Sequence, residues 1–205
     1  DPQACAMWAR RHMNRYGTTS EQRGRVAGDI RANAIDNPRA MMRTPLTLED
    51  HQASRPIVDP FRMYDICLES DGACAVLVTS AERARDLRKP PVLIMGGAYG
   101  GGPAQGDDLF DALRWPDHSH NFLPYIRDEL WSKAGVGPKD VDIAEIYDCF
   151  TYSVLMALEG LGFCAPGEAA DMVADGHIRR DGALPVNPHG RLLSEAYIHG
   201  LNHVL

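Results

Sequence analysis

Long apolar runs are missing from this sequence of 205 residues. The longest extend from Ala73 to Val78 and from Pro90 to Met95, whereas a helix that crosses a membrane needs about 20 apolar residues in succession. We therefore expect no membrane as a partner. Internal repeats and low-complexity segments are also missing, and 44% of the residues are apolar against 24% charged. This composition is typical of a globular protein with enough material for a core.

The sequence also has no excess of positively charged residues. The chain carries 21 Lys and Arg against 28 Asp and Glu, a formal net charge of −7 with its eight His neutral, so its overall field repels polyanions. We expect no nucleic acid as a partner. The arginines between residues 10 and 31 are a local exception, but such a run more often covers the solvated faces of helices than it binds phosphate.

Paired cysteine motifs are absent. The five cysteines, at positions 5, 67, 74, 149 and 164, form no CxxC pair. An odd number without paired spacing favours a reducing compartment over a disulfide framework, and we therefore expect a cytoplasmic protein. The first residues also lack an initiating Met, a basic leader region and a signal-peptide core, so the natural start is expected to lie upstream of residue 1.

Common metal and dinucleotide motifs are incomplete. His199 and His203 have the i,i+4 spacing of a zinc-binding helix, but the Glu of the HExxH motif is absent and no carboxylate or Cys ligand is evident nearby. The glycines at 100–102 follow an apolar run but lack the GxGxxG spacing and the following helix of a dinucleotide site. We expect neither a bound metal nor a dinucleotide cofactor.

The segments that are present alternate between helical and strand-like patterns. Apolar spacing predicts the longer helices at residues 3–16, 18–37, 121–134 and 150–161. Thr18 and Glu21 have the spacing of a capping box for the second of them. The unbroken apolar runs at 73–78 and 92–95 predict two strands buried on both faces, and the alternation at 140–147 predicts a third strand. The order of elements indicates a mixed α/β protein.

Two motifs have a more specific pattern. Residues 145–150 read E-I-Y-D-C-F, and residues 184–200 read L-P-V-N-P-H-G-R-L-L-S-E-A-Y-I-H-G. Together they resemble two active-site motifs of the thiolase superfamily, in its sterol-carrier-protein and lipid-transfer-protein-type branch. Those motifs read roughly E-x-H/N-D/E-x-F and N-P-x-G-G-x-x-x-x-G-H-P-x-G. Residues 54–61 and 71–76 also resemble the final strand region of that family's N-terminal half.

This resemblance implies the fold class α/β, with the layered αβαβα thiolase fold of two similar halves, the N-terminal one incomplete here. Residues 1–88 would end the N-terminal half with its connecting loop region, and residues 89–205 would form an incomplete C-terminal half. By the same comparison residue 1 follows the family's nucleophilic Cys, and residue 205 precedes its second catalytic Cys. The N-terminal and extreme C-terminal segments are thus expected to be missing, and none of the five cysteines takes either role.

Two departures from the family pattern bear on the chemistry. Tyr147 stands where a thiolase carries His or Asn in the first motif, and Tyr197 stands where it carries the His of G-H-P. Losing both groups argues against ordinary thiolysis. The pair resembles the actinobacterial steroid-degrading aldolases of the lipid-transfer type. This implies a carbon–carbon lyase that splits a 17-hydroxy steroid with a three-carbon CoA side chain into a 17-keto steroid and propionyl-CoA.

Such a retro-aldol step has simple chemical requirements. It removes a proton from the β-hydroxyl, breaks the Cα–Cβ bond and stabilises a thioester enolate, so no covalent nucleophile is needed. Because free Tyr has a pKa near ~10, a neighbour must assist a Tyr base. Asp148 is adjacent but anionic and would raise that pKa if it came close, whereas two roles are open for His199, as a cation or as a proton relay. Both residues belong to the predicted catalytic set. We hypothesise Tyr197 as base and Tyr147 as acid or enolate donor, and the sequence leaves the reverse assignment open.

The resemblance also implies partners. It implies a homodimer and a partner protein with an OB-fold and a zinc ribbon, of the DUF35 type. CoA is expected only as part of the substrate thioester, with no tightly bound cofactor. Two alternatives stay open: a thiolase or acyl-CoA acyltransferase that uses a Cys outside this chain, and a non-catalytic lipid-binding member in which both Tyr simply pack.

Overall fold

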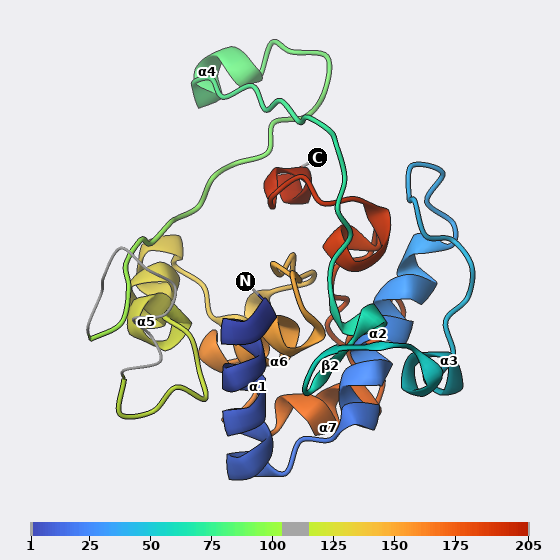
Figure 1. The fold of residues 1–205 in the computed structure, drawn as a ribbon. Coiled ribbons are helices and arrows are strands. Elements are labelled where there is room, and N and C mark those ends of the chain that lie inside the picture. The colour runs from blue at the N-terminus through green and yellow to red at the C-terminus, as the bar shows by residue number, and fades with distance from the viewer. Residues whose placement is uncertain (1, 104–114, 205) are drawn as a thin grey trace.

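A computed structural model describes residues 2–103 and 115–204 of the chain (Figure 1). The helices are α1 (Pro2–Tyr16), α2 (Ser20–Ala34), α3 (Leu48–Ala53), α4 (Ala81–Ala84), α5 (Leu123–Ala134), α6 (Thr151–Gly160) and α7 (Ala169–Ala174). The 3-10 turns are η1 (Met63–Asp65), η3 (Pro138–Asp140) and η5 (Leu201–Val204), and η4 (Arg191–Glu195) is a π turn. The strands β1 (Pro56–Val58) and β2 (Phe61–Arg62) pair in antiparallel orientation. Among the described helices, none is long and apolar enough to cross a bilayer.

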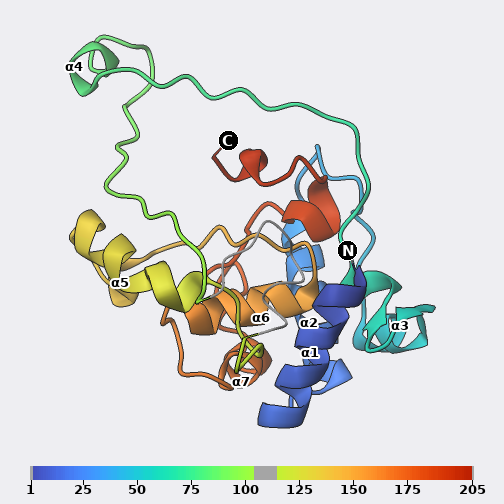
Figure 2. The same cartoon turned by 60° about the vertical axis from the view of Figure 1, so that its left-hand side comes forward.

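The core forms around α6, which runs through the helical body beside α2 and α7 (Figure 2). Val154, Leu155 and Leu158 of α6 are fully buried against Val26 and Ile30 of α2. Helix α6 is apolar on nearly its whole circumference, which is why it is covered on all sides. Burial of each such side chain contributes about 1.5–3 kcal/mol. The body therefore supplies a rigid support for the residues that precede α6.

The predicted helices are confirmed, with one correction at the start of α2. Its N-cap is Thr19, whose hydroxyl accepts from the amide of Gln22 while the Gln22 side chain accepts from the amide of Thr19. The capping box predicted for Thr18 and Glu21 is therefore wrong by one residue. Thr18 instead places its hydroxyl 2.8 Å from Nδ1 of the buried His12. The sequence pattern did not show which of the two neighbouring threonines is the N-cap. Tertiary packing decides it, because Thr18 contacts His12 and Thr19 is left to cap the helix.

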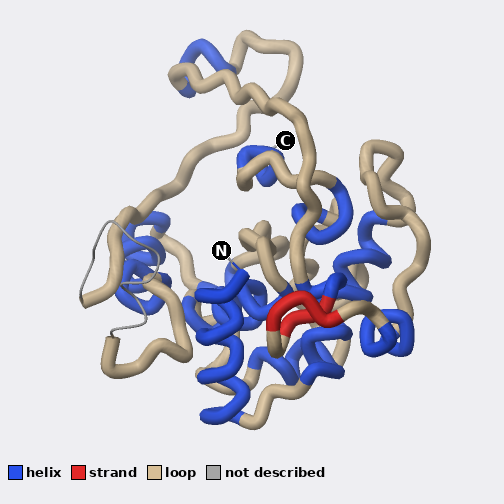
Figure 3. The backbone as a smooth tube through the Cα atoms, in the orientation of Figure 1, coloured by secondary structure: helices blue, strands red, loops and turns tan. Residues whose placement is uncertain are grey.

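The predicted buried strands at 73–78 and 92–95 are wrong for this chain. Both segments are extended but unpaired, with Leu77 86% exposed and Val92 96% exposed. They lead to and from α4 in a long loop that projects away from the body (Figure 1) and is drawn as loop in Figure 3. A strand needs a neighbour to share its backbone hydrogen bonds, and within the described chain neither segment pairs with another.

The strand predicted at 140–147 is reduced to a short parallel bridge. The amide of Ala144 donates to the carbonyl of Pro185 at 3.0 Å, and the amide of Asn187 donates to the carbonyl of Ala144 at 3.1 Å. This bridge is small, but it sets the first motif alongside the second. The division of the chain at residue 88 stays a prediction.

Candidate active site

Tyr147 and Tyr197, which are 50 residues apart in sequence, meet at their phenol groups. The two hydroxyl oxygens are 2.6 Å apart, and the ring centroids are 6.3 Å apart at an angle of 64°. The hydroxyl of Tyr197 also lies 3.1 Å from Nδ1 of His199. Three of the four site residues predicted from sequence therefore form one continuous hydrogen-bonded chain, from Tyr147 through Tyr197 to His199.

Two side chains hold Tyr147 in place through the backbone. Asn187, fully buried, accepts from the amide of Ile146 at 2.8 Å and donates to the carbonyl of Ile146 at 3.0 Å. Ser153, in the first turn of α6, accepts from the amide of Phe150 at 3.2 Å and lies 3.1 Å from the carbonyl oxygen of Tyr147. Tyr147 is thus fixed between the second motif and the start of the core helix.

Asp148, the fourth predicted residue, faces a different set of partners. Its side chain is fully buried, and its two oxygens accept from the amides of Leu192 at 3.1 Å and Leu193 at 3.3 Å. Nε of Arg191 lies 3.9 Å from one of these oxygens. Burial raises the pKa of Asp148 to about 7, against the opposing charge of Arg191 and the hydrogen bonds from the backbone. The carboxyl joins the two motifs, and a direct catalytic role for it stays a prediction.

Burial also decides the protonation of Tyr147. It raises the pKa of the Tyr147 phenol well above the ordinary value of 10, and the hydrogen bond with Tyr197 adds to the increase. Tyr147 therefore keeps its proton at neutral pH and is suited to donating a hydrogen bond or a proton.

A network of charged groups beneath the phenol pair was not predicted from sequence. His189 lies between Glu145, with Nε2 3.1 Å from Oε2, and Glu195, with Nδ1 2.7 Å from Oε2. Burial lowers the pKa of His189, but the hydrogen bond to Glu145 and the charges of both carboxylates outweigh it and raise that pKa. Buried Arg191 donates to Glu145 at 3.5 Å and also to Nδ1 of His203. The only signal in the sequence was the presence of these polar residues inside or just after the motifs.

The cysteines near the site are poor nucleophiles in this environment. The amide of Cys67 donates to the carbonyl of Cys149 at 3.0 Å, which places Cys67 beside the first motif, to which Cys149 belongs. Burial raises the pKa of the Cys67 thiol to about 12 and that of the Cys149 thiol to about 11. Because the thiolate is the reactive form, neither Cys is prepared for attack on a thioester.

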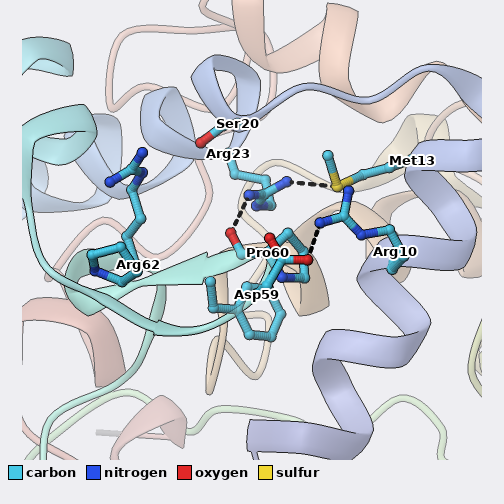
Figure 4. A pocket seen from close by; sticks show the side chains of 9 residues that line it. Arg10, Met13, Ser20, Arg23, Asp59, Pro60 and Arg62 are labelled. Carbon is cyan, nitrogen blue, oxygen red and sulfur yellow. Dashed lines mark hydrogen bonds and ion pairs between the residues drawn. The ribbon is translucent and has the colours of Figure 1, made fainter.

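A separate pocket of about 210 Å³ lies between α1, α2 and the β1–β2 hairpin and is lined by Arg10, Arg23 and Arg62 (Figure 4). Its guanidinium groups are already engaged by the protein. Arg10 is paired with Asp59, Arg23 donates to the carbonyl of Pro60 at 2.7 Å, and Arg62 donates to the carbonyl of Ser54 at 2.9 Å. These contacts join the hairpin to the helices, and none of the predicted site residues lines this pocket.

The scaffold places a hydrogen-bonded pair of phenols at the meeting point of the two motifs, and phenols are among the groups that serve in general acid–base chemistry. The thiolase C-terminal domain-like family matches residues 128–203. A steroid side-chain-cleaving aldolase of Thermomonospora curvata is 48% identical over 97% of this chain and 51% of its own length. The 17-hydroxy-3-oxo-4-pregnene-20-carboxyl-CoA lyase of Mycobacterium tuberculosis is 45% identical over 97% of this chain and 52% of its own length.

A solved structure described as an Ltp2-ChsH2(DUF35) aldolase superposes with a TM-score of 0.94 at 47% identity, covering 99% of this chain and 53% of that one. The chain belongs to the thiolase superfamily, and its α/β fold class is that of a thiolase-like protein. The chain spans about half the length of the curated relatives it matches.

Proposed function

We propose that the complete natural protein is a carbon–carbon lyase that cleaves the side chain of a 17-hydroxy steroid acyl-CoA by a retro-aldol reaction. The observation that carries this proposal is the 2.6 Å contact between the phenol oxygens of Tyr147 and Tyr197. Both phenols replace the groups that a thiolase uses at these positions, and the relatives from Thermomonospora curvata and Mycobacterium tuberculosis are named as an aldolase and a lyase.

The base in this proposal is Tyr197 acting together with His199. As the oxygen of Tyr197 accepts the proton of the substrate's 17-hydroxyl, its own proton passes to Nδ1 of His199, 3.1 Å away. A tyrosinate is then never needed as a resting state, which removes the difficulty posed by an ordinary Tyr pKa near ~10. The electrons of the O–H bond form the 17-ketone, and the electrons of the broken Cα–Cβ bond form the thioester enolate.

Tyr147 is the acid. Its phenol keeps its proton because its pKa is raised by burial, and it protonates the α-carbon of the enolate to give propionyl-CoA. The proton held on His199 then returns through Tyr197 to Tyr147 along the same chain of hydrogen bonds. One proton has moved from the hydroxyl oxygen to the α-carbon, and the enzyme is restored without a redox agent or added CoA.

The partners of the complete protein are part of the same proposal. A DUF35-type partner is supported by the similar solved structure, an Ltp2-ChsH2(DUF35) aldolase. The OB-fold and zinc ribbon of this partner, and a homodimer, are expected from the family resemblance. CoA enters only as part of the substrate, with no tightly bound cofactor. A reducing, cytoplasmic location suits the cysteines, which are free wherever the structure describes them.

The test is product analysis with the complete natural protein and any partner that purifies with it. The substrate is the CoA thioester of a 17-hydroxy steroid with a three-carbon side chain, supplied without free CoA. We expect a 17-keto steroid and propionyl-CoA in equal amounts, and no cleavage of the matched substrate that lacks the 17-hydroxyl. Products that appear only when free CoA is added would support the thiolase alternative, and binding without turnover would support the lipid-binding alternative.

A further inference from the structure

His203, in η5, carries a ring nitrogen whose protonation is set by its neighbour. Arg191 directs Nη2 at Nδ1 of His203. A guanidinium can only donate hydrogen bonds, so Nδ1 must be the acceptor. In the neutral imidazole the ring proton is then on Nε2. Arg191 is itself fully buried, so this choice of tautomer is built into the fold.

The resulting Nε2–H donor has no acceptor among the residues that the structure describes. Nε2 of His203 is shielded from water and makes no hydrogen bond within the part of the chain that the structure describes. Burial, together with the positive charges of Arg191 and His189, lowers the pKa of His203 to about 3, so the ring stays neutral at any working pH. A buried donor without an acceptor costs free energy and calls for a physical explanation, such as a ligand that completes it.

The position of this donor is beside the acid of the proposed reaction. The ring centroid of His203 lies 6.2 Å from that of Tyr147. Gly200, with a φ of +85°, passes between them, and a Cβ there would be 3.5 Å from Nε2 of His203 and 3.4 Å from the ring of Tyr147. A Cβ there would also be 3.2 Å from Cε1 of His203, closer than ordinary contact, so the absence of a side chain at Gly200 lets the two rings lie this close to its backbone.

We propose that His203 is a further catalytic residue, whose Nε2–H donates a hydrogen bond to the thioester oxygen as that oxygen becomes an enolate. This inference rests on the proposed function, in which Tyr147 protonates carbon and some other group must stabilise the oxygen. The guanidinium of Arg191 behind the imidazole favours an acceptor that gains negative charge. A donor fixed in a site shielded from water needs no reorganisation during the reaction, and one such donor is worth about 10²–10³ in kcat.

The first test is a binding comparison in the complete natural protein, which needs no turnover. Propionyl-CoA carries the thioester oxygen, and S-propyl-CoA is the matched thioether without it. We expect His203→Phe to weaken propionyl-CoA binding by about 3- to 10-fold, the worth of one hydrogen bond, and to leave S-propyl-CoA unchanged. His177→Phe, at an exposed His outside the site, should change neither. Equal weakening of both ligands would show a merely structural role, and no change in either would overturn the proposal.

A second measurement covers the case in which His203→Phe fails to fold. In the unaltered protein, the ¹H and ¹⁵N signals of the His203 Nε2–H group should shift when propionyl-CoA is added and should not shift with S-propyl-CoA. Identical responses to both ligands would reject the assigned contact. Cleavage of the steroid substrate by the unaltered protein is measured separately, so the failure of the aldolase proposal and the failure of this inference give different results.

Discussion

The phenol oxygens of Tyr147 and Tyr197 lie 2.6 Å apart, and Tyr197 continues the contact to Nδ1 of His199 at 3.1 Å. This order matters because burial raises the pKa of the inner member, Tyr147, and so holds that phenol in the protonated form. The outer member has a histidine that can take its proton. The same chain of groups can therefore remove a proton from oxygen at one end and deliver a proton to carbon at the other.

Replacing either phenol should stop this transfer. We expect Tyr147→Phe and Tyr197→Phe each to lower kcat for steroid side-chain cleavage by at least about 10²-fold, the low end for general acid–base catalysis. The double variant should be little worse than either single one, because both residues act in one relay. Steady-state assays of ketone release in the complete protein measure this.

Tyr125→Phe is the matched control, because Tyr125 lies on α5 and is 48% exposed. Its turnover should equal that of the unaltered protein. Single Tyr variants of the pair that keep full activity would exclude the relay as the catalytic device.

Removing Asp148 should destabilise the fold rather than only the chemistry. Asp148→Ala leaves the amides of Leu192 and Leu193 without their acceptor. Each buried, unsatisfied group costs about 1–3 kcal/mol, so we expect a loss of roughly 2–6 kcal/mol in the free energy of unfolding. Urea denaturation measures the loss. Asp142→Ala, at an exposed position just before the first motif, should stay within about 0.5 kcal/mol. Equal effects of the two substitutions would contradict the positioning role of Asp148.

The raised pKa of Asp148 predicts a particular dependence of stability on pH. Its pKa is about 7 in the folded chain against an ordinary value of 3.8, so between these pH values the folded state binds more protons than the unfolded state. The contribution of Asp148 to the free energy of unfolding is therefore fully present below the ordinary pKa of 3.8 and is lost as the pH rises from there through about 7.

Asp148→Asn cannot titrate and serves as the reference for this effect. We expect the stability of the unaltered protein, measured relative to Asp148→Asn by urea denaturation at a series of pH values, to decrease from about pH 4 to about pH 7. Titration of His189 and the other groups is common to both proteins and cancels in the comparison. A relative stability that increases over this range would mean that Arg191 outweighs burial at Asp148.

Gly190 should be irreplaceable at the start of η4. Its φ is +94°, and a Cβ there would lie 2.3 Å from Cβ and 2.8 Å from Cα of Ala34 on α2. Gly135 also has a positive φ, of +72°, but a Cβ there would meet nothing within 4 Å. Gly135→Ala should therefore cost only the backbone strain of about 1–2 kcal/mol. Gly190→Ala should cost a further ~1–3 kcal/mol for the overlap with α2, and thermal or urea unfolding of the two variants compares them.

The sequence alone was sufficient to predict the elements whose signals are local. The spacing of apolar side chains located α1, α2, α5 and α6 to within a few residues, because a helix makes its hydrogen bonds within itself. The two motifs placed Tyr147, Tyr197 and His199 in one site, and the structure brings those three residues together. The strands at 73–78 and 92–95 could not be predicted in the same way, because a strand exists only where a second segment pairs with it.

The residue types of the site were thus determined by the sequence, and their roles were decided by the tertiary structure. Asp148 follows Tyr147 directly in the sequence, yet its carboxyl accepts hydrogen bonds from the backbone of η4. These bonds hold the segment that leads to Tyr197. His203 resembled half of a zinc motif in the sequence, and only the contact with Arg191 makes it a neutral N–H donor beside Tyr147. Protonation depends on burial and on neighbours from distant parts of the chain, and these are settled only when the chain has folded.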